Sequence, residues 1–214
     1  MYADDIILLA PSISGLQLLL STCEEEIKFL DMSINAKKSC CLRVGPRCDN
    51  SCAHLTTADG CVLSWVTSCR YLGIFLQNSK IFSCSFEHSK SAYYNAFNAI
   101  FGKIGRTASE DVVLQLIKAK CLPVLLYGTE ACPVKSAALY SFDFCINRIF
   151  FKIFKTFDKV VINESRHSFG FFEIKDVINK RKNKFLLKFG ANENEICVAL
   201  REAVSLDIAE LAKI

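Results

Sequence analysis

The sequence has no apolar run long enough to cross a membrane. Ile6–Ala10 is too short to span a bilayer, and the stretch from residue 112 to residue 127 is interrupted by three polar residues and a proline, namely Gln115, Lys118, Lys120 and Pro123. We therefore predict no transmembrane segment and no membrane partner.

A strong excess of one charge is also missing. The 26 Lys and Arg residues stand against 22 Asp and Glu residues, which gives a net charge of +4. This value is too small to identify a nucleic-acid-binding protein by itself, so such a function has to be argued from local clusters of basic residues. Disorder is excluded, because 51% of the 214 residues are hydrophobic and 17 are Phe, enough to bury a core in one domain or two small ones.

No secretory leader opens the chain, which begins Met1-Tyr2-Ala3-Asp4-Asp5. We therefore interpret its 12 cysteines as reduced intracellular thiols. Cys48, Cys52 and His54 contain sulfur and imidazole for zinc, but paired Cys-x-x-Cys spacing is missing, so free thiols explain them better. A small zinc-dependent interaction module is the alternative, and metal analysis of the purified protein tests it.

Short strands and one helix are expected in residues 1–84. Ile6–Leu9 has the continuous apolar pattern of a buried strand, and Ser14 can cap a helix that runs to Leu30 with Glu24 facing water. Asp59-Gly60 predicts a two-residue hairpin turn. The expected strands of this part are Cys40–Val44, Leu55–Ala58, Cys61–Trp65 and Tyr71–Leu76.

Helical periodicity replaces these patterns from residue 85 and continues almost to the end. We place a domain boundary there, between residues 1–84 and 85–214. The expected helices are Ser85–Ile104, Ser109–Cys121, Ala138–Phe157 and Ile174–Phe189, with a shorter one near the C-terminus. The predicted fold class is α+β.

Asp4 and Asp5 are adjacent carboxylates at an expected tight turn. Mg²⁺ prefers such hard oxygen ligands, and nucleotidyl transfer uses two such ions to activate a hydroxyl and to neutralise the leaving pyrophosphate. The alternative is that the pair simply caps a turn or helix.

Four segments together resemble reverse transcriptases of non-long-terminal-repeat (LINE-type) retrotransposons over nearly the whole chain. Tyr2-Ala3-Asp4-Asp5 with the following Ile6–Leu9 is similar to the catalytic palm hairpin, and Met32–Ser39 is similar to the next palm motif, including its Asn-x-x-Lys-Ser spacing. Trp65 with Tyr71–Ile74 resembles the primer-grip region, and Leu126–Glu130 resembles a segment of the thumb and connection region. The family usually has a glycine near Asp31, which is a departure.

The resemblance implies RNA-templated DNA synthesis, with an RNA template, a DNA primer, deoxynucleoside triphosphates and two Mg²⁺ ions as partners, in the nucleus or cytoplasm. Asp4 would be the principal metal ligand beside Asp5, with Tyr2 close to the incoming nucleotide or primer end. Lys38 would approach the triphosphate and donate a proton as general acid, the alternative being a solvated lysine pair. The hairpin residues Tyr71, Leu72 and Gly73 would steady the primer strand.

In fold, the resemblance implies a truncated antiparallel palm sheet with packed helices, from the catalytic turn to the primer grip, and then a mainly helical thumb and connection region. It also implies that a further metal-binding aspartate and the fingers region precede residue 1. The chain would then be a fragment of the enzyme, and we expect little or no polymerase activity from it alone.

A basic run lies in the last long predicted helix. It could follow a nucleic-acid backbone while Phe185 and Phe189 pack inward, or it could be the polar face of an ordinary amphipathic helix. The residues that we expect to contact the backbone are Lys180, Arg181, Lys184 and Lys188, with Lys175 and Lys182 nearby. The alternative function is therefore a catalytically silent nucleic-acid-binding or interaction fragment.

Overall fold

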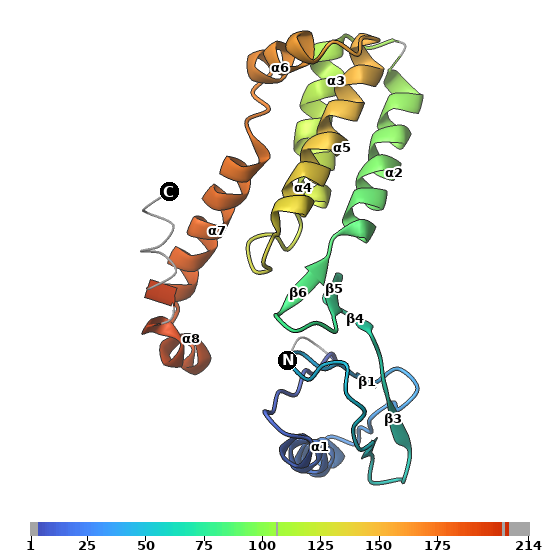
Figure 1. The fold of residues 1–214 in the computed structure, drawn as a ribbon, viewed down its shortest axis with the longest axis vertical. Helices are drawn as coiled ribbons and strands as arrows, with labels where there is room; N and C mark the ends of the chain where they lie inside the picture. Colours follow the sequence, from blue (N-terminus) through green and yellow to red (C-terminus); the bar gives the residue numbers. More distant parts are fainter. Residues whose placement is uncertain (1–3, 106, 203, 206–214) are drawn as a thin grey trace. The chain divides into compact units, whose positions relative to one another are not determined.

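The computed structural model describes residues 4–105, 107–202 and 204–205. The fold is mixed α+β, and the chain divides into two compact units, Met1–Ser85 and Phe86–Ile214 (Figure 1). The boundary placed after residue 84 lies one residue from this division. Whether the units correspond to a palm and a thumb stays a prediction.

The first unit opens with helix α1 (Ile13–Lys28) and a small sheet. The sheet contains β1 (Cys40–Cys41), β3 (Val62–Trp65) and β2 (Leu55–Thr56) in that order; β1 is parallel to β3, and β2 is antiparallel to it. The palm sheet expected from the resemblance was antiparallel, so the β1–β3 pair is a correction.

Buried side chains from α1 and all three strands form the core of this sheet. They are Leu20, Cys41, Leu55 and Leu63, and Leu8, Ile13, Leu16, Ile34, Ala36 and Trp65 pack against them. The expected strand at Ile6–Leu9 is wrong, because these residues form no strand and only Leu8 turns toward the core. Leu9 is 77% exposed, and an apolar run needs a hydrogen-bonded neighbour to become a buried strand.

Both ends of α1 have capping structures. The N-cap is Ser12, whose hydroxyl accepts from the Gly15 N–H at 3.1 Å, so Ser14 lies inside the helix and does not cap it as predicted. At the other end the Asp31 N–H donates to Lys28 O, and the Met32 N–H donates to Ile27 O, both at 3.1 Å. This is a Schellman motif with Asp31 at φ 53°, in the left-handed region that favours glycine.

Two side chains of α1 hold the β2–β3 hairpin. The Gln17 amide donates to Thr56 O at 2.8 Å and accepts from the Thr56 N–H at 3.0 Å. The Glu24 carboxylate accepts from the Ala58 N–H through both oxygens at 3.0 Å. Glu24 is therefore buried, not facing water as expected, because it satisfies a backbone donor in the hairpin loop.

The hairpin at Asp59-Gly60 is confirmed, but its loop is longer than predicted. The Thr57 N–H donates to Cys61 O at 2.9 Å, and the Gly60 N–H donates to Thr57 O at 2.9 Å. Three residues, Ala58 to Gly60, thus close the loop, with Gly60 at φ 77° in the left-handed position of a bulged turn.

A second sheet completes the first unit. Its strands β4 (Ser68–Tyr71), β5 (Ile74–Gln77) and β6 (Ser83–Ser85) are antiparallel in sequence order. The single strand expected at Tyr71–Leu76 is therefore wrong. The chain reverses at Leu72 and Gly73, whose φ values of 46° and 81° are those of a type I′ turn.

The second unit is helical within its described residues. Helices α2, α3–η1–α4 and α5 lie side by side, and α6 and α7 also contact α5 (Figure 1). The helices are α2 (Glu87–Ile104), α3 (Glu110–Leu116), the π-helix η1 (Ile117–Cys121), α4 (Leu122–Leu125), α5 (Ser136–Phe154), α6 (Lys159–Ser168), α7 (Ile174–Gly190) and α8 (Glu195–Ala199).

The helix expected at Ser109–Cys121 continues past Pro123. A proline ring clashes with the carbonyl four residues earlier in an ordinary α-helix, and the residue four positions before Pro123, Ala119, lies in the wider turns of η1. The π-helix thus allows one continuous helical stretch where the sequence predicted an end.

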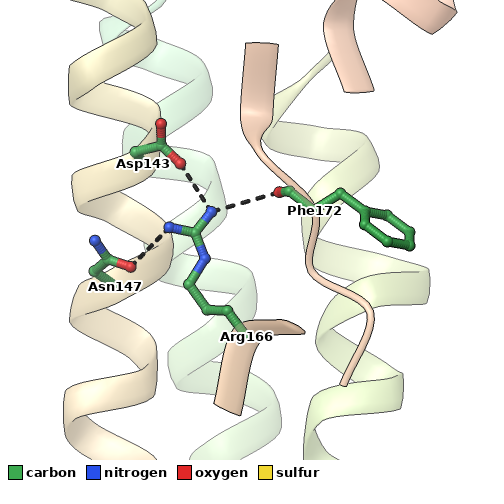
Figure 2. A network of polar contacts seen from close by, with 4 residues as sticks. All are labelled: Asp143, Asn147, Arg166 and Phe172. Atoms are coloured by element: carbon green, nitrogen blue, oxygen red, sulfur yellow. Dashed lines mark hydrogen bonds and ion pairs between the residues drawn. The ribbon is translucent and has the colours of Figure 1, made fainter. Parts of the chain in front are cut away.

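Arg166 fixes the short helix α6 to α5. Its guanidinium donates to Asp143 Oδ1 at 2.8 Å and to Asn147 Oδ1 at 2.9 Å, with a longer contact of 3.5 Å to Phe172 O (Figure 2). Arg166 is only 9% exposed, and burial of a guanidinium requires such pairing. Helix α6 was not expected from the sequence.

The core of the second unit contains a hydroxyl without a partner. Tyr93 on α2 is fully buried, and its hydroxyl has no hydrogen-bond partner among the described residues. Burial, with Cys121 and Cys145 nearby, raises the pKa of Tyr93 well above its usual range.

Candidate functional site

Asp4 and Asp5 are exposed, and Asp4 lies in a turn. Tyr2, the expected nucleotide or primer contact, lies outside the described residues. Across residues 4–105, 107–202 and 204–205, no three His, Cys, Asp or Glu side chains are grouped to hold a metal ion. Asp4 and Asp5 thus present two carboxylates to solvent, and their role as metal ligands stays a prediction.

Lys38 stands at the end of a turn that Asn35 organises. The Asn35 side chain accepts from the Lys37 and Lys38 N–H groups, both at 3.2 Å, and the Asn35 carbonyl accepts from the N–H groups of Lys38 and Ser39. The Asn-x-x-Lys-Ser spacing thus has a local structural role, since asparagine stabilises turns in this way. The Lys38 side chain is exposed.

One core cluster anchors the chain on either side of these residues. Leu8 follows the Asp4–Asp5 turn by a few residues, and Ile34 and Ala36 flank Asn35; all three pack against the buried cluster of α1 and the first sheet. Both exposed turns are therefore attached to the same small core. Of the expected site, the structure shows that both turns are attached to one core.

The expected primer-binding residues lie in the second sheet. Tyr71 ends β4 and is half-buried, and Leu72 and Gly73 form the type I′ turn. A tight hairpin thus exists at the position that the resemblance assigned to primer contact. Its role stays a prediction.

The expected nucleic-acid contacts on α7 fall into two groups. Lys180, Lys184 and Lys188 are exposed and spaced by four residues, which places them about 6 Å apart along one helix face. Arg181 instead donates to the two carboxylate oxygens of Glu130 at 3.3 and 3.2 Å and is half-buried. Its charge is already paired within the unit, and Glu130 is the partner that sequence reasoning missed.

The positive charge of the chain belongs to the second unit. Residues 86–214 contain 19 Lys and Arg against 14 Asp and Glu, whereas residues 1–85 contain 7 against 8. The first unit is thus nearly neutral, and the basic stripe of α7 lies in a unit of net charge +5.

The proposed zinc ligands line a pocket of about 280 Å³ in the first unit. Cys48, Cys52 and His54 all contribute to its wall, but they do not form a three-ligand metal group in the part of the chain that the structure describes. Arg43, Asn78 and Trp65 complete much of the lining. The sulfur and imidazole of this region were evident from the sequence, but the pocket was not.

Two buried thiols resist ionisation. Burial raises the pKa of Cys41 to about 11, with Cys40 and Cys52 adding to the effect, and burial raises the pKa of Cys121 to about 11. Both therefore stay neutral at physiological pH and are poor nucleophiles.

Comparison of the chain with protein families, with curated proteins and with solved structures finds no match. Among the described residues, no helix has both the length and the apolar content that a membrane span requires.

Proposed function

We propose that this chain is part of an RNA-directed DNA polymerase of the non-long-terminal-repeat retrotransposon type, with its nucleotidyl-transfer site at Asp4 and Asp5. The observation that carries the proposal is the attachment of two exposed turns, Asp4–Asp5 and the Asn35-organised turn of Lys38, to one core. Carboxylates and a lysine presented from one support suit the binding of metal and triphosphate.

The Schellman turn at Asp31 gives separate support. Its positive φ is the conformation that glycine adopts at least cost, and the resembled family usually has a glycine near this position. The backbone here has a glycine-like conformation although the residue is aspartate.

In the proposed reaction, Asp4 and Asp5 would hold Mg²⁺, and two such ions would supply activation of the primer hydroxyl and neutralisation of phosphate charge. Lys38 faces the triphosphate, where its ammonium offsets negative charge and donates a proton to the leaving pyrophosphate. The Tyr71–Gly73 hairpin steadies the primer strand. We propose that this chain alone extends primers little or not at all, because no third His, Cys, Asp or Glu joins Asp4 and Asp5 in a metal-holding group among the described residues.

Manganese binding tests the site without requiring turnover. Free Mn²⁺ is measured by electron paramagnetic resonance with the chain, a template–primer duplex and a deoxynucleoside triphosphate present together. We expect the triphosphate to increase Mn²⁺ binding, because phosphates and carboxylates share the ion, and we expect the double variant Asp4→Asn, Asp5→Asn to lose this increase.

Asp59→Asn is the matched control, since Asp59 is an exposed carboxylate of the same unit in a hairpin loop. The proposal fails if the double variant binds Mn²⁺ as well as the unmodified chain does. It also fails if Asp59→Asn reduces the binding equally.

The second candidate function is nucleic-acid binding without catalysis, and the exposed stripe of Lys180, Lys184 and Lys188 favours it. Each backbone phosphate that a lysine neutralises contributes about 0.9 to the slope of log affinity against log salt on duplex DNA. Replacing the three lysines by glutamine should therefore reduce that slope by about 2.7.

A matched triple variant separates a specific stripe from general charge. Lys103, Lys135 and Lys159 are exposed lysines of the same unit outside α7, and their replacement by glutamine removes the same charge. We expect this variant to change the slope much less. Equal effects of the two variants would show that only the overall charge attracts nucleic acid, and the stripe would have no special role.

A further inference from the structure

The pocket of the first unit lies under a loop, residues 45–54, that side chains from outside it hold in place. Arg43 donates through Nη1 to Arg47 O and Asn50 O, both at 2.8 Å, and the Trp65 ring N–H donates to Ala53 O at 3.1 Å. The Asn78 amide donates to Cys48 O at 3.2 Å. Three different side chains thus fix the loop by its carbonyls, so the pocket beneath it is preformed.

Arg43 leaves charged hydrogen-bond donors unused in this pocket. Only Nη1 of Arg43 bonds to the loop, so the N–H groups of Nε and Nη2 have no partner among the described residues. His54 also lines the pocket, and the lining contains no Asp or Glu. A permanent positive charge with spare donors, in a lining without a carboxylate, attracts an anion.

The wall also has an apolar part. Trp65 and Val66 form one side, and the Arg43 guanidinium stands 5.5 Å from the centre of the Trp65 ring. The volume of about 280 Å³ is at the small end of ligand pockets. The size and lining fit a compact molecule with an apolar body and one charged group.

We propose that this pocket binds a small anion in which a phosphate or carboxylate group is attached to a flat apolar body. The charged group is received by the free N–H groups of Arg43, with His54 beside it, and the apolar body lies against Trp65 and Val66. This site is separate from Asp4 and Asp5 and does not depend on the function proposed above.

The chain contains a single tryptophan, which is Trp65, so its fluorescence reports directly on the pocket. Phenyl phosphate, benzoate and inorganic phosphate are titrated with a chelator present to exclude metals, and calorimetry confirms the stoichiometry. Benzamide is the neutral analogue of benzoate, and a tryptophan amide in solution corrects for quenching. We expect phenyl phosphate or benzoate to saturate the signal at one site per chain and benzamide to bind at least tenfold more weakly. Comparison of phenyl phosphate with benzoate shows which anionic group the site prefers.

Ser51 allows a charge to be added to the pocket without removing a contact, because it is exposed in the lining and has no hydrogen bond within the described residues. Ser51→Asp and Ser51→Asn differ by one negative charge at nearly equal size. We expect the aspartate variant to bind the anion about tenfold more weakly than the asparagine variant.

Arg43→Gln removes the receiving charge, and Arg47→Gln, in the same loop but outside the lining, is its control. We expect only the Arg43 variant to lose binding. The proposal is overturned if no anion changes the fluorescence or heat, if benzamide binds as tightly as benzoate, or if the two Ser51 variants bind equally. Because Ser51 holds no part of the loop, its result decides the matter even if Arg43→Gln disturbs the fold.

Discussion

Arg166 allows a quantitative test of how the second unit is held together (Figure 2). Replacement by methionine keeps an unbranched apolar stem of similar length but removes the guanidinium. The variant therefore loses the bonds to Asp143 and Asn147 while most of the packing around the stem remains.

The expected loss follows from the separate contacts. A hydrogen bond to a charged partner contributes about 1.5–3 kcal/mol when buried, and the low end applies because the Asp143 side chain is 35% exposed. The bond to Asn147 adds about 1 kcal/mol. The contact to Phe172 O at 3.5 Å adds little at that length. We expect Arg166→Met to lower the free energy of unfolding by about 2–3 kcal/mol.

Urea unfolding followed by far-ultraviolet circular dichroism measures this loss, and hydrogen exchange shows whether α6 amides lose protection first. A double-mutant cycle with Asp143→Asn isolates the ion pair, for which we expect a coupling of about 1–2 kcal/mol. Arg148→Met is the control, since Arg148 is an exposed arginine of α5. A change below about 0.5 kcal/mol for Arg166→Met, or no coupling to Asp143, would refute the reasoning.

Three further predictions concern single positions. Asp31→Gly should raise the free energy of unfolding by about 1 kcal/mol, because glycine adopts the positive φ of 53° without strain; a loss of stability in thermal melts would contradict the Schellman geometry. Tyr93→Phe should be neutral or stabilising by about 1 kcal/mol in urea unfolding, because it removes a buried hydroxyl without a partner among the described residues; marked destabilisation would show that the hydroxyl is bonded. Burial raises the pKa of Cys41 and Cys121 to about 11, above their ordinary value of 9.0. The contribution of these thiols to the free energy of unfolding is therefore intact below pH 9.0 and is lost as the pH rises toward 11. Between these pH values each thiol should lower the free energy of unfolding by about 1.4 kcal/mol per pH unit. Cys121→Ala should therefore remove about 1.4 kcal/mol per pH unit from the slope that urea unfolding measures.

The long helices could be predicted from the sequence because their apolar spacing repeats over many turns. Ile174–Phe189 was predicted and α7 ends one residue later, at Gly190. Helix α6 was missed because it is short and buries only Ile162 and Arg166, too few positions for a periodic signal. Its start was visible only in Asp158, whose carboxylate accepts from the Val160 N–H at 2.8 Å.

The first unit was harder to predict because its strands are short and depend on neighbours. The run Ile6–Leu9 has a strand composition but no strand, and the pattern of Tyr71–Leu76 concealed a turn at Leu72, where a branched residue has a positive φ. The Leu72-Gly73 pair was the available sign, since glycine favours such turns.

The candidate site residues also divide into those whose environment follows from the sequence and those whose environment depends on distant partners. The exposure of Asp4, Asp5 and Lys38 could be expected from their types, and the Asn35 turn from its spacing. The pairing of Arg181 with Glu130 could not be expected, because the partners are 51 positions apart and only the folded chain brings them together. Burial of Glu24 depends likewise on a backbone donor, at Ala58, that sequence patterns do not mark.

The two bonds between Gln17 and Thr56 have a consequence for association between molecules. Strand β2 is at the edge of its sheet, where free backbone groups would serve as a template for a strand from another copy of the protein. The glutamine amide occupies both groups of Thr56 and so imitates a neighbouring strand. Aggregation by strand addition at this edge would first have to pull a helix away from the sheet.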